Sequence, residues 1–112
     1  MPATERLRFR ELALVDVEAA TQWYAQQAGE RAALGFLDAL DAAYAHIERH
    51  PATGSPRLGL ELEVPDLRSW PLDRFPHLVF YVERENYVEV WRVLHGARDI
   101  PAAFAEPPPS AD

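Results

Sequence analysis

A single glycine separates the two longest helical patterns of this chain. Residues 13–28 repeat apolar side chains at intervals of three and four, and residues 30–50 do the same. Gly29 is typical of the end of a helix, and a connection this short places consecutive helices side by side. We therefore expect an antiparallel helical hairpin, around which the rest of the fold must be built.

Both helices have one apolar face and a charged opposite face. Asp16 and Glu18 lie near the start of the first helix, where the helix dipole favours negative charge. His50 precedes Pro51, which disfavours helical geometry and ends the second helix. The expected apolar positions are Leu14, Val17, Thr21, Tyr24 and Ala28 in the first helix, and Ala33, Phe36, Leu37, Leu40, Tyr44 and Ile47 in the second.

Strand patterns flank the hairpin on both sides. Residues 7–12 alternate apolar and charged side chains, and a Pro/Gly loop at 51–60 precedes three further strands at 67–72, 77–83 and 87–93. In the last strand, alternation places Val88, Val90 and Arg92 on one face, and Tyr87, Glu89, Trp91 and Val93 on the other.

The element order is β-α-α-β-β-β, which predicts an α+β fold with the helical hairpin packed on a small, mostly antiparallel sheet. A chain of 112 residues is one domain. We place this domain at residues 1–104, followed by a flexible Pro-rich tail at 105–112. The chain is expected to fray from Pro101 onward.

Composition excludes several classes of protein. The chain has no cysteine, which excludes disulfides and thiolate chemistry. Its net charge is −7, and all eleven basic residues are arginines. Residues 11–66 carry ten acidic side chains against three arginines, which we interpret as a solvated acidic helix face. With neither a signal peptide nor a membrane-spanning run in the sequence, we expect a cytoplasmic protein.

Motifs for cofactor or metal chemistry are missing from the sequence. It contains no glycine-rich phosphate loop, zinc-finger spacing or nucleophile elbow. His46 and His50 could share a metal on one helix, but exposed histidines are the favoured interpretation because no acidic third ligand follows at helical spacing. We therefore predict no cofactor and no metal. Trp91 is expected in the core, and Trp23 half exposed at a protein interface.

The element order and a set of motifs together resemble the RelE/ParE toxin superfamily of type II toxin–antitoxin systems, on the ParE-like plasmid-stabilisation side. The resemblance covers residues 7–104. It is carried by Asp16-Val17, Trp23-Tyr24, Ala33, Phe36, Leu40, Pro51, Gly54, Leu67-Arg68, Phe75-Pro76, residues 78–81, and above all residues 92–99, RVLHGARD.

This resemblance implies a small cytoplasmic toxin in a hetero-oligomer with a co-encoded antitoxin, whose disordered part folds as it wraps the toxin. ParE-like toxins are associated with inhibition of DNA gyrase by protein contact, without direct DNA or membrane binding. The expected antitoxin-binding residues are Trp23, Tyr24 and Phe36, with the neighbouring sheet edge. The expected target-contact surface is Arg68, Arg92, His95 and Arg98, although Arg98 and Asp99 could instead pair with each other or cap the corner.

Two alternatives follow from the same resemblance. RelE-like relatives cleave mRNA, and His77, Arg92 and His95 could form a metal-independent endoribonuclease site. Against this, His77 stands where the ribonucleases have an arginine, and no lysine supplies their basic set. We favour His95 as a residue that bonds backbone at a strand end, and His77 as the start of an exposed strand. The second alternative is an inactive relic that only binds its antitoxin.

Overall fold

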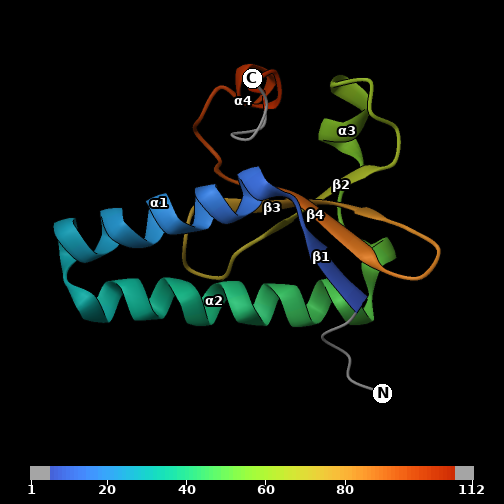
Figure 1. Cartoon of the computed structure of the whole chain (residues 1–112). Helices are drawn as coiled ribbons and strands as arrows, with labels where there is room; N and C mark the ends of the chain where they lie inside the picture. The colour runs from blue at the N-terminus through green and yellow to red at the C-terminus, as the bar shows by residue number, and fades with distance from the viewer. Residues whose placement is uncertain (1–5, 108–112) are drawn as a thin grey trace.

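The computed structural model describes residues 6–107, and Figure 1 shows its elements in chain order. Most of them match the expected positions, with ends shifted by one to three residues. The elements are β1 (Leu7–Phe9), α1 (Glu11–Ala28), α2 (Glu30–Arg49), the 3₁₀ turn η2 (Pro51–Thr53), α3 (Arg57–Glu61), β2 (Leu67–Pro71), β3 (His77–Glu83), β4 (Val88–His95) and α4 (Ile100–Phe104). Gly29 joins α1 to α2 with a φ of 94°, a value that glycine adopts without strain.

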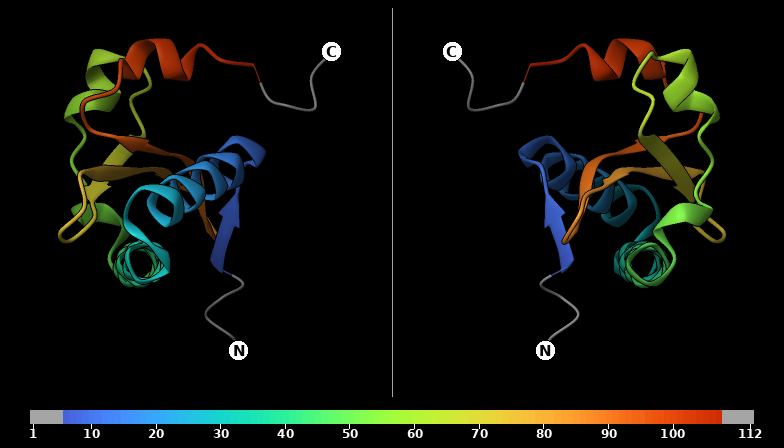
Figure 2. Two further views of the ribbon diagram at one scale, coloured as in Figure 1. Left: turned by 90° about the vertical axis from the view of Figure 1, so that its left-hand side faces the viewer. Right: turned by 90° about the vertical axis from the view of Figure 1, so that its right-hand side faces the viewer.

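The four strands form one sheet in the order β1-β4-β3-β2. β1 runs parallel to β4, and the other two pairs are antiparallel, so the sheet is mostly antiparallel as predicted. Figure 2 shows the α1/α2 hairpin on one face of the sheet, with α3 and α4 on the other. The fold is therefore α+β, with a core on each side of the sheet.

The predicted alternation of side chains along β4 is wrong beyond Val90, because the strand contains a β-bulge. Phe80 pairs with Arg92 and Tyr81 pairs with Val90, which leaves Trp91 as the extra residue. The shift brings Val93 into the hairpin-side core together with Val88 and Val90, whereas sequence alternation had separated it from them. The bulge thus changes which face the last residues of β4 present, just before the His95 turn.

Three further expectations are wrong. The segment 51–60 is not a plain loop, because it contains η2 and the beginning of α3. The chain does not fray at Pro101: Pro101 lies in the first turn of α4, where a missing N–H is tolerated, and Ile100 and Ala103 are buried. Leu14 is exposed, since α1 buries Ala13 in its place. Residues 108–112 of the predicted tail lie outside the described residues.

The segment after α2 is held to the sheet by Tyr81, which is fully buried. Its hydroxyl donates to the Pro51 carbonyl at 2.6 Å and accepts from the Gly54 N–H at 3.0 Å. Replacing Tyr81 with phenylalanine should lower the free energy of unfolding by about 1–3 kcal/mol, because the Gly54 N–H loses its partner. Urea denaturation measures this change, and a loss below about 0.5 kcal/mol would contradict it.

Candidate functional site

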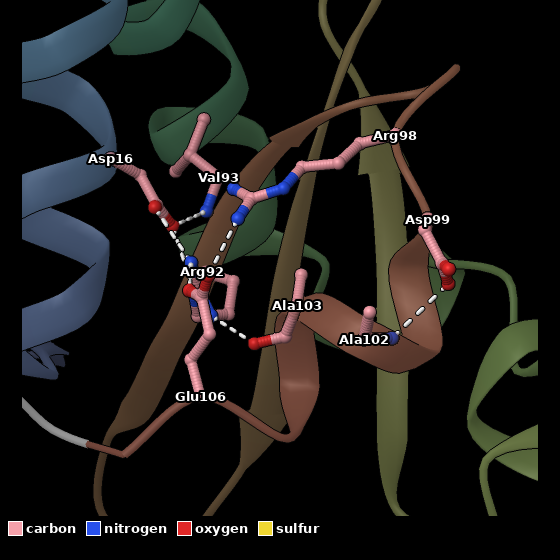
Figure 3. A network of polar contacts seen from close by, with 8 residues as sticks. All are labelled: Asp16, Arg92, Val93, Arg98, Asp99, Ala102, Ala103 and Glu106. Carbon is pink, nitrogen blue, oxygen red and sulfur yellow. Dashed lines mark hydrogen bonds and ion pairs between the residues drawn. The ribbon is translucent and has the colours of Figure 1, made fainter.

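The carboxylate of Asp16 binds the edge of β4 beyond the end of β1 (Figure 3). It accepts hydrogen bonds from the Val93 N–H at 3.0 Å and from the Arg92 Nε and Nη2 at 2.8 and 2.9 Å. The pair is almost completely withdrawn from solvent, with side-chain exposures of 9% for Asp16 and 5% for Arg92. Asp16 therefore does more than complement a helix dipole: it anchors α1 to β4.

The remaining donors of Arg92 are also bound. Its Nη1 donates to the Ala103 carbonyl at 2.5 Å, and its Nη2 lies 3.1 Å from Glu106. The hydrogen bonds to Asp16 raise the pKa of the Arg92 guanidinium, against the opposing effect of burial. Because this arginine is 4% exposed and fully engaged, it is not available to a target or a phosphate as the fold stands.

The turn after β4 is held by its own residues. The Asp99 side chain accepts a hydrogen bond from the Ala102 N–H at 3.1 Å and caps α4. Arg98 pairs with Glu106 at 2.8 Å, and both side chains are more than 40% exposed. Of the two structural roles expected for Arg98 and Asp99, Asp99 therefore takes the capping role, and Arg98 finds its partner in Glu106.

The two histidines of interest lie side by side. His77 is paired with His95 in the β3–β4 ladder, and their ring centroids are 5.3 Å apart. His77 is 7% exposed and packs against the rings of Tyr24 and Phe36, so β3 does not begin exposed as expected. His95 is exposed, and its Nδ1 accepts from the Ala97 N–H at 3.0 Å, the backbone bond predicted for it.

These contacts set the protonation of His77. Burial, assisted by the proximity of His95, lowers the pKa of His77 from 6.5 to about 4. At neutral pH His77 is therefore an uncharged imidazole, and its Nδ1 has no hydrogen-bond partner within the described part of the chain. At His95 the bond from Ala97 leaves the proton of the neutral ring on Nε2.

The histidines line a groove between α1 and the end of the sheet. One hollow of about 440 Å³ is bounded by Ala20, Trp23, Tyr24, Pro76, His77 and His95. A second, of about 240 Å³, shares Ala20, His77 and His95 with it and extends to Asp16, Ala19, Val93, Leu94 and Arg98. Together we call these two hollows the α1–β4 groove. Trp23 stands at its wall with 56% of its surface exposed.

The structure thus brings some of the predicted site residues together and separates others. Trp23, Tyr24, His77, His95 and Arg98 line the α1–β4 groove. Phe36 is fully buried beneath it and supports the rings of Tyr24 and His77. Arg68 lies on β2 opposite Tyr81 and donates to the Gly54 carbonyl at 2.8 Å, away from the His77–His95 end of the ladder.

Sequence reasoning missed Ala19, Ala20 and Glu106 as residues of this region. Ala19 and Ala20 form the helix wall of the groove, and small helical residues carry no chemical signal of such a role. Glu106 falls in the segment predicted as a tail, yet it pairs with Arg92 and Arg98. The only signal of this pairing in the sequence was its negative charge, a short distance after Arg92 and Arg98.

His46 is engaged in other contacts, whereas His50 is exposed as expected. His46 stacks on Trp70 with ring centroids 3.9 Å apart, and its Nε2 lies 2.8 Å from the Thr53 hydroxyl. Within residues 6–107 there is no group of three or more His, Asp or Glu side chains placed to hold a metal ion. A search of those residues for helices long and apolar enough to cross a membrane also finds none.

A helical hairpin on one face of a mostly antiparallel four-stranded sheet, with a short helix after β4, is a RelE/ParE-like fold. The profile of the family described as "ParE toxin of type II toxin-antitoxin system, parDE" matches residues 7–100. This chain belongs to the ParE toxin family.

Among solved structures, the chain is similar to one titled "Chromosomal ParDE TA system from P. aeruginosa". The TM-score is 0.67 at 20% sequence identity, and the match covers 80% of this chain and 92% of that one. At this identity the likeness concerns the fold. No curated protein matches the chain.

Proposed function

We propose that this chain is a toxin that inhibits DNA gyrase by protein contact in the cytoplasm, and that a co-encoded antitoxin neutralises it. Membership of the ParE family supports the toxin role. The proposed target-contact surface is His95 and Arg98, which lie at the exposed end of β4 and in the turn after it. Arg92 is left out because it is buried, and Arg68 because it lies on the other edge strand.

One observation favours contact over catalysis: the charge state of the α1–β4 groove. RNA cleavage without a metal needs cations to stabilise the charge that develops on the phosphate. Here the charge of Arg92 is neutralised by ion pairs with Asp16 and Glu106. Arg98 is the only arginine that lines the groove, and it is paired with Glu106. His77 is uncharged at neutral pH. A groove with so little free positive charge is better suited to bind another protein than to bind a polyanion such as RNA.

The purified chain should inhibit DNA supercoiling by gyrase. Arg98→Glu should weaken that inhibition by about tenfold, because reversing a charge in a contact surface costs on the order of 1.4 kcal/mol. Arg57→Glu is the matched control: Arg57 is exposed on α3, at a distance from the groove, and should retain full inhibition. Supercoiling that continues at a large molar excess of the chain would exclude gyrase as the target.

The endoribonuclease alternative retains one favourable observation, the direct juxtaposition of His77 and His95. An uncharged imidazole beside an exposed one is an arrangement that acid–base catalysis can use. Cleavage of RNA by the free chain, lost in His95→Ala, would support this alternative. Equal cleavage by His95→Ala would exclude His95 as the catalyst. If expression of the chain alone fails to arrest bacterial growth, the inactive-relic alternative holds instead.

Antitoxin binding should depend on Trp23. A half-exposed tryptophan at the wall of an apolar groove is typical of the residues that dominate binding energy. Trp23→Ala should therefore weaken the affinity for the antitoxin encoded by the adjacent gene by about 30-fold, or roughly 2 kcal/mol. Leu60→Ala is the control, because Leu60 is a similarly exposed apolar residue but lies on α3. Calorimetry measures both, and equal affinities would remove Trp23 from the interface.

A further inference from the structure

β1 and the beginning of β4 carry arginines on the face that looks away from the helical hairpin. Leu7 and Phe9 of β1 face the hairpin, where Phe9 stacks on the ring of Tyr44. Arg8 and Arg10 alternate with these residues along the strand, so they point to the opposite face, and both are exposed. We call this surface the arginine strip and define it by Arg8, Arg10, Arg84, Tyr87, Glu89 and Trp91.

Two arginines of the strip lie over aromatic rings. The guanidinium carbon of Arg8 is 4.6 Å from the centre of the Tyr87 ring. That of Arg10 is 3.6 Å from the centre of the Trp91 ring. A cation–π contact fixes the planar group on one side, and leaves its N–H edge to bind a phosphate and its other side to stack on a nucleobase. The two arginines stand about 6.6 Å apart along β1, which is twice the rise of one strand residue.

A single carboxylate orders two cations of the strip. Glu89 accepts hydrogen bonds from the Trp91 Nε1 and the Arg84 Nη2, both at 3.0 Å. Its second oxygen lies 3.4 Å from the Arg10 Nε. One negative charge therefore holds two guanidinium groups and cannot neutralise both, and Arg8 forms no ion pair within residues 6–107. The strip thus keeps an excess of positive charge in a chain whose net charge is −7.

The strip ends at a hollow beside α4. The hollow has a volume of about 180 Å³, and its apolar walls are Leu12, Trp91 and Phe104. Of its acidic residues, Glu106 is already bound by arginines, and Glu11 lies at the beginning of α1. An apolar cavity of about 150 Å³ is enough to hold benzene, so this hollow has room for one flat ring.

These features select the kind of partner. Spaced cations suit a phosphate backbone, and stacked guanidinium planes beside a ring-sized hollow suit nucleobases. An acidic peptide would use the cations but would leave the planes and the hollow empty. A duplex would also use the cations, but its bases are stacked on one another and cannot reach the hollow. The strip therefore fits a single strand.

We propose that the arginine strip binds single-stranded nucleic acid. The three arginines bind phosphates, one base stacks on a guanidinium plane, and a neighbouring base enters the hollow against Trp91. None of these contacts depends on the 2′-hydroxyl, so DNA and RNA should bind alike. This activity goes beyond the proposed function, because it needs neither gyrase nor antitoxin. It also departs from the absence of direct DNA binding that the family resemblance implied.

Fluorescence anisotropy of the intact chain with a short labelled oligothymidylate tests the proposal. Each phosphate contact contributes about −0.7 to the slope of log Kobs against log salt concentration for a single strand. Three contacts should therefore give a slope of about −2. The matching oligouridylate should bind within about twofold of the oligothymidylate, and a duplex of the same length at least about fivefold more weakly.

Two substitutions of Arg8 separate charge from stacking. Arg8→Glu should weaken binding by at least about tenfold, because it places a negative charge against the phosphates. Arg8→Lys keeps the charge but has no planar group to stack on a base, and should weaken binding about fivefold. Arg57→Glu is the control, since it changes the net charge as much as Arg8→Glu does. Arg57 is exposed on α3, near the β2 edge of the sheet, where salt screens it from the strip, and binding should change by less than about twofold.

The outcomes identify the partner or remove it. Circular dichroism should show all variants folded, because Arg8 and Arg57 are exposed. If Arg8→Lys binds as tightly as the wild type, charge alone holds the strand and the stacking role is overturned. Tighter binding of the duplex, or equal displacement of the oligonucleotide by polyglutamate, would overturn the single strand in favour of a duplex or an acidic protein. If no strand binds at low salt, the strip lacks this activity, and inhibition of gyrase is still decided by its own assay.

Discussion

Arg92→Ala should lower the free energy of unfolding by about 3–5 kcal/mol, the typical cost of removing one partner from a buried ion pair. The substitution leaves the Asp16 carboxylate buried with the Val93 N–H as its remaining partner, and it removes the donor to the Ala103 carbonyl. It therefore loosens α1 and α4 together. A loss of this size is a large fraction of the stability of a small domain.

Two further variants make the measurement decisive. Asp16→Asn keeps a polar group near the Val93 N–H but removes the charge, and should cost about half as much as Arg92→Ala. Arg98→Ala is the matched control, since the Arg98–Glu106 pair is exposed on both sides and should contribute less than about 1 kcal/mol. Urea denaturation followed by circular dichroism measures all three. A cost below about 1 kcal/mol for Arg92→Ala would show that the network does not anchor these elements.

The elements that the sequence predicted correctly are those with strong local patterns. The hairpin around Gly29 follows from two long helical repeats and a glycine at positive φ. β3 matches its expected bounds of His77 to Glu83 because its β-branched and aromatic residues are contiguous. In these segments the local preference and the tertiary environment agree, which is why pattern alone sufficed.

The features that escaped prediction are those set by contacts between distant residues. Asp16 and Arg92 are 76 positions apart, and neither residue identifies the other in a single sequence. The bulge at Trp91 is also invisible to alternation, because it depends on how β4 fits β3. Arg92 was therefore expected on a contact surface, when its charge is in fact used inside the fold.

The candidate site was partly accessible from the sequence. His77 and His95 could be singled out by residue type and by their places at the two ends of strands. That they lie directly opposite each other is a matter of β3–β4 register, which no composition or spacing fixes. Ala19 and Ala20 acquire their role only once α1 lies beside the end of β4.

Acidification should destabilise the fold through His77. The folded-state pKa of about 4 lies below the ordinary value of 6.5, so between these pH values the unfolded chain binds a proton that the folded chain does not. Stability is therefore lost as the pH falls from about 7 toward 4, and this one group accounts for about 3 kcal/mol of the loss. Carboxylates that titrate in the same pH range also change the stability. The contribution of His77 is therefore measured by comparing the wild type with a variant that lacks this imidazole.

His77→Phe isolates this contribution. Phenylalanine cannot bind a proton, and it keeps a flat ring against Tyr24 and Phe36. The variant should therefore equal or exceed the wild type in stability at pH 7, because it also removes the unpaired Nδ1. Between pH 7 and pH 4 it should lose about 3 kcal/mol less than the wild type. Equal losses in both proteins would mean that His77 is not held neutral by its surroundings, and that the α1–β4 groove carries a charge at mildly acidic pH.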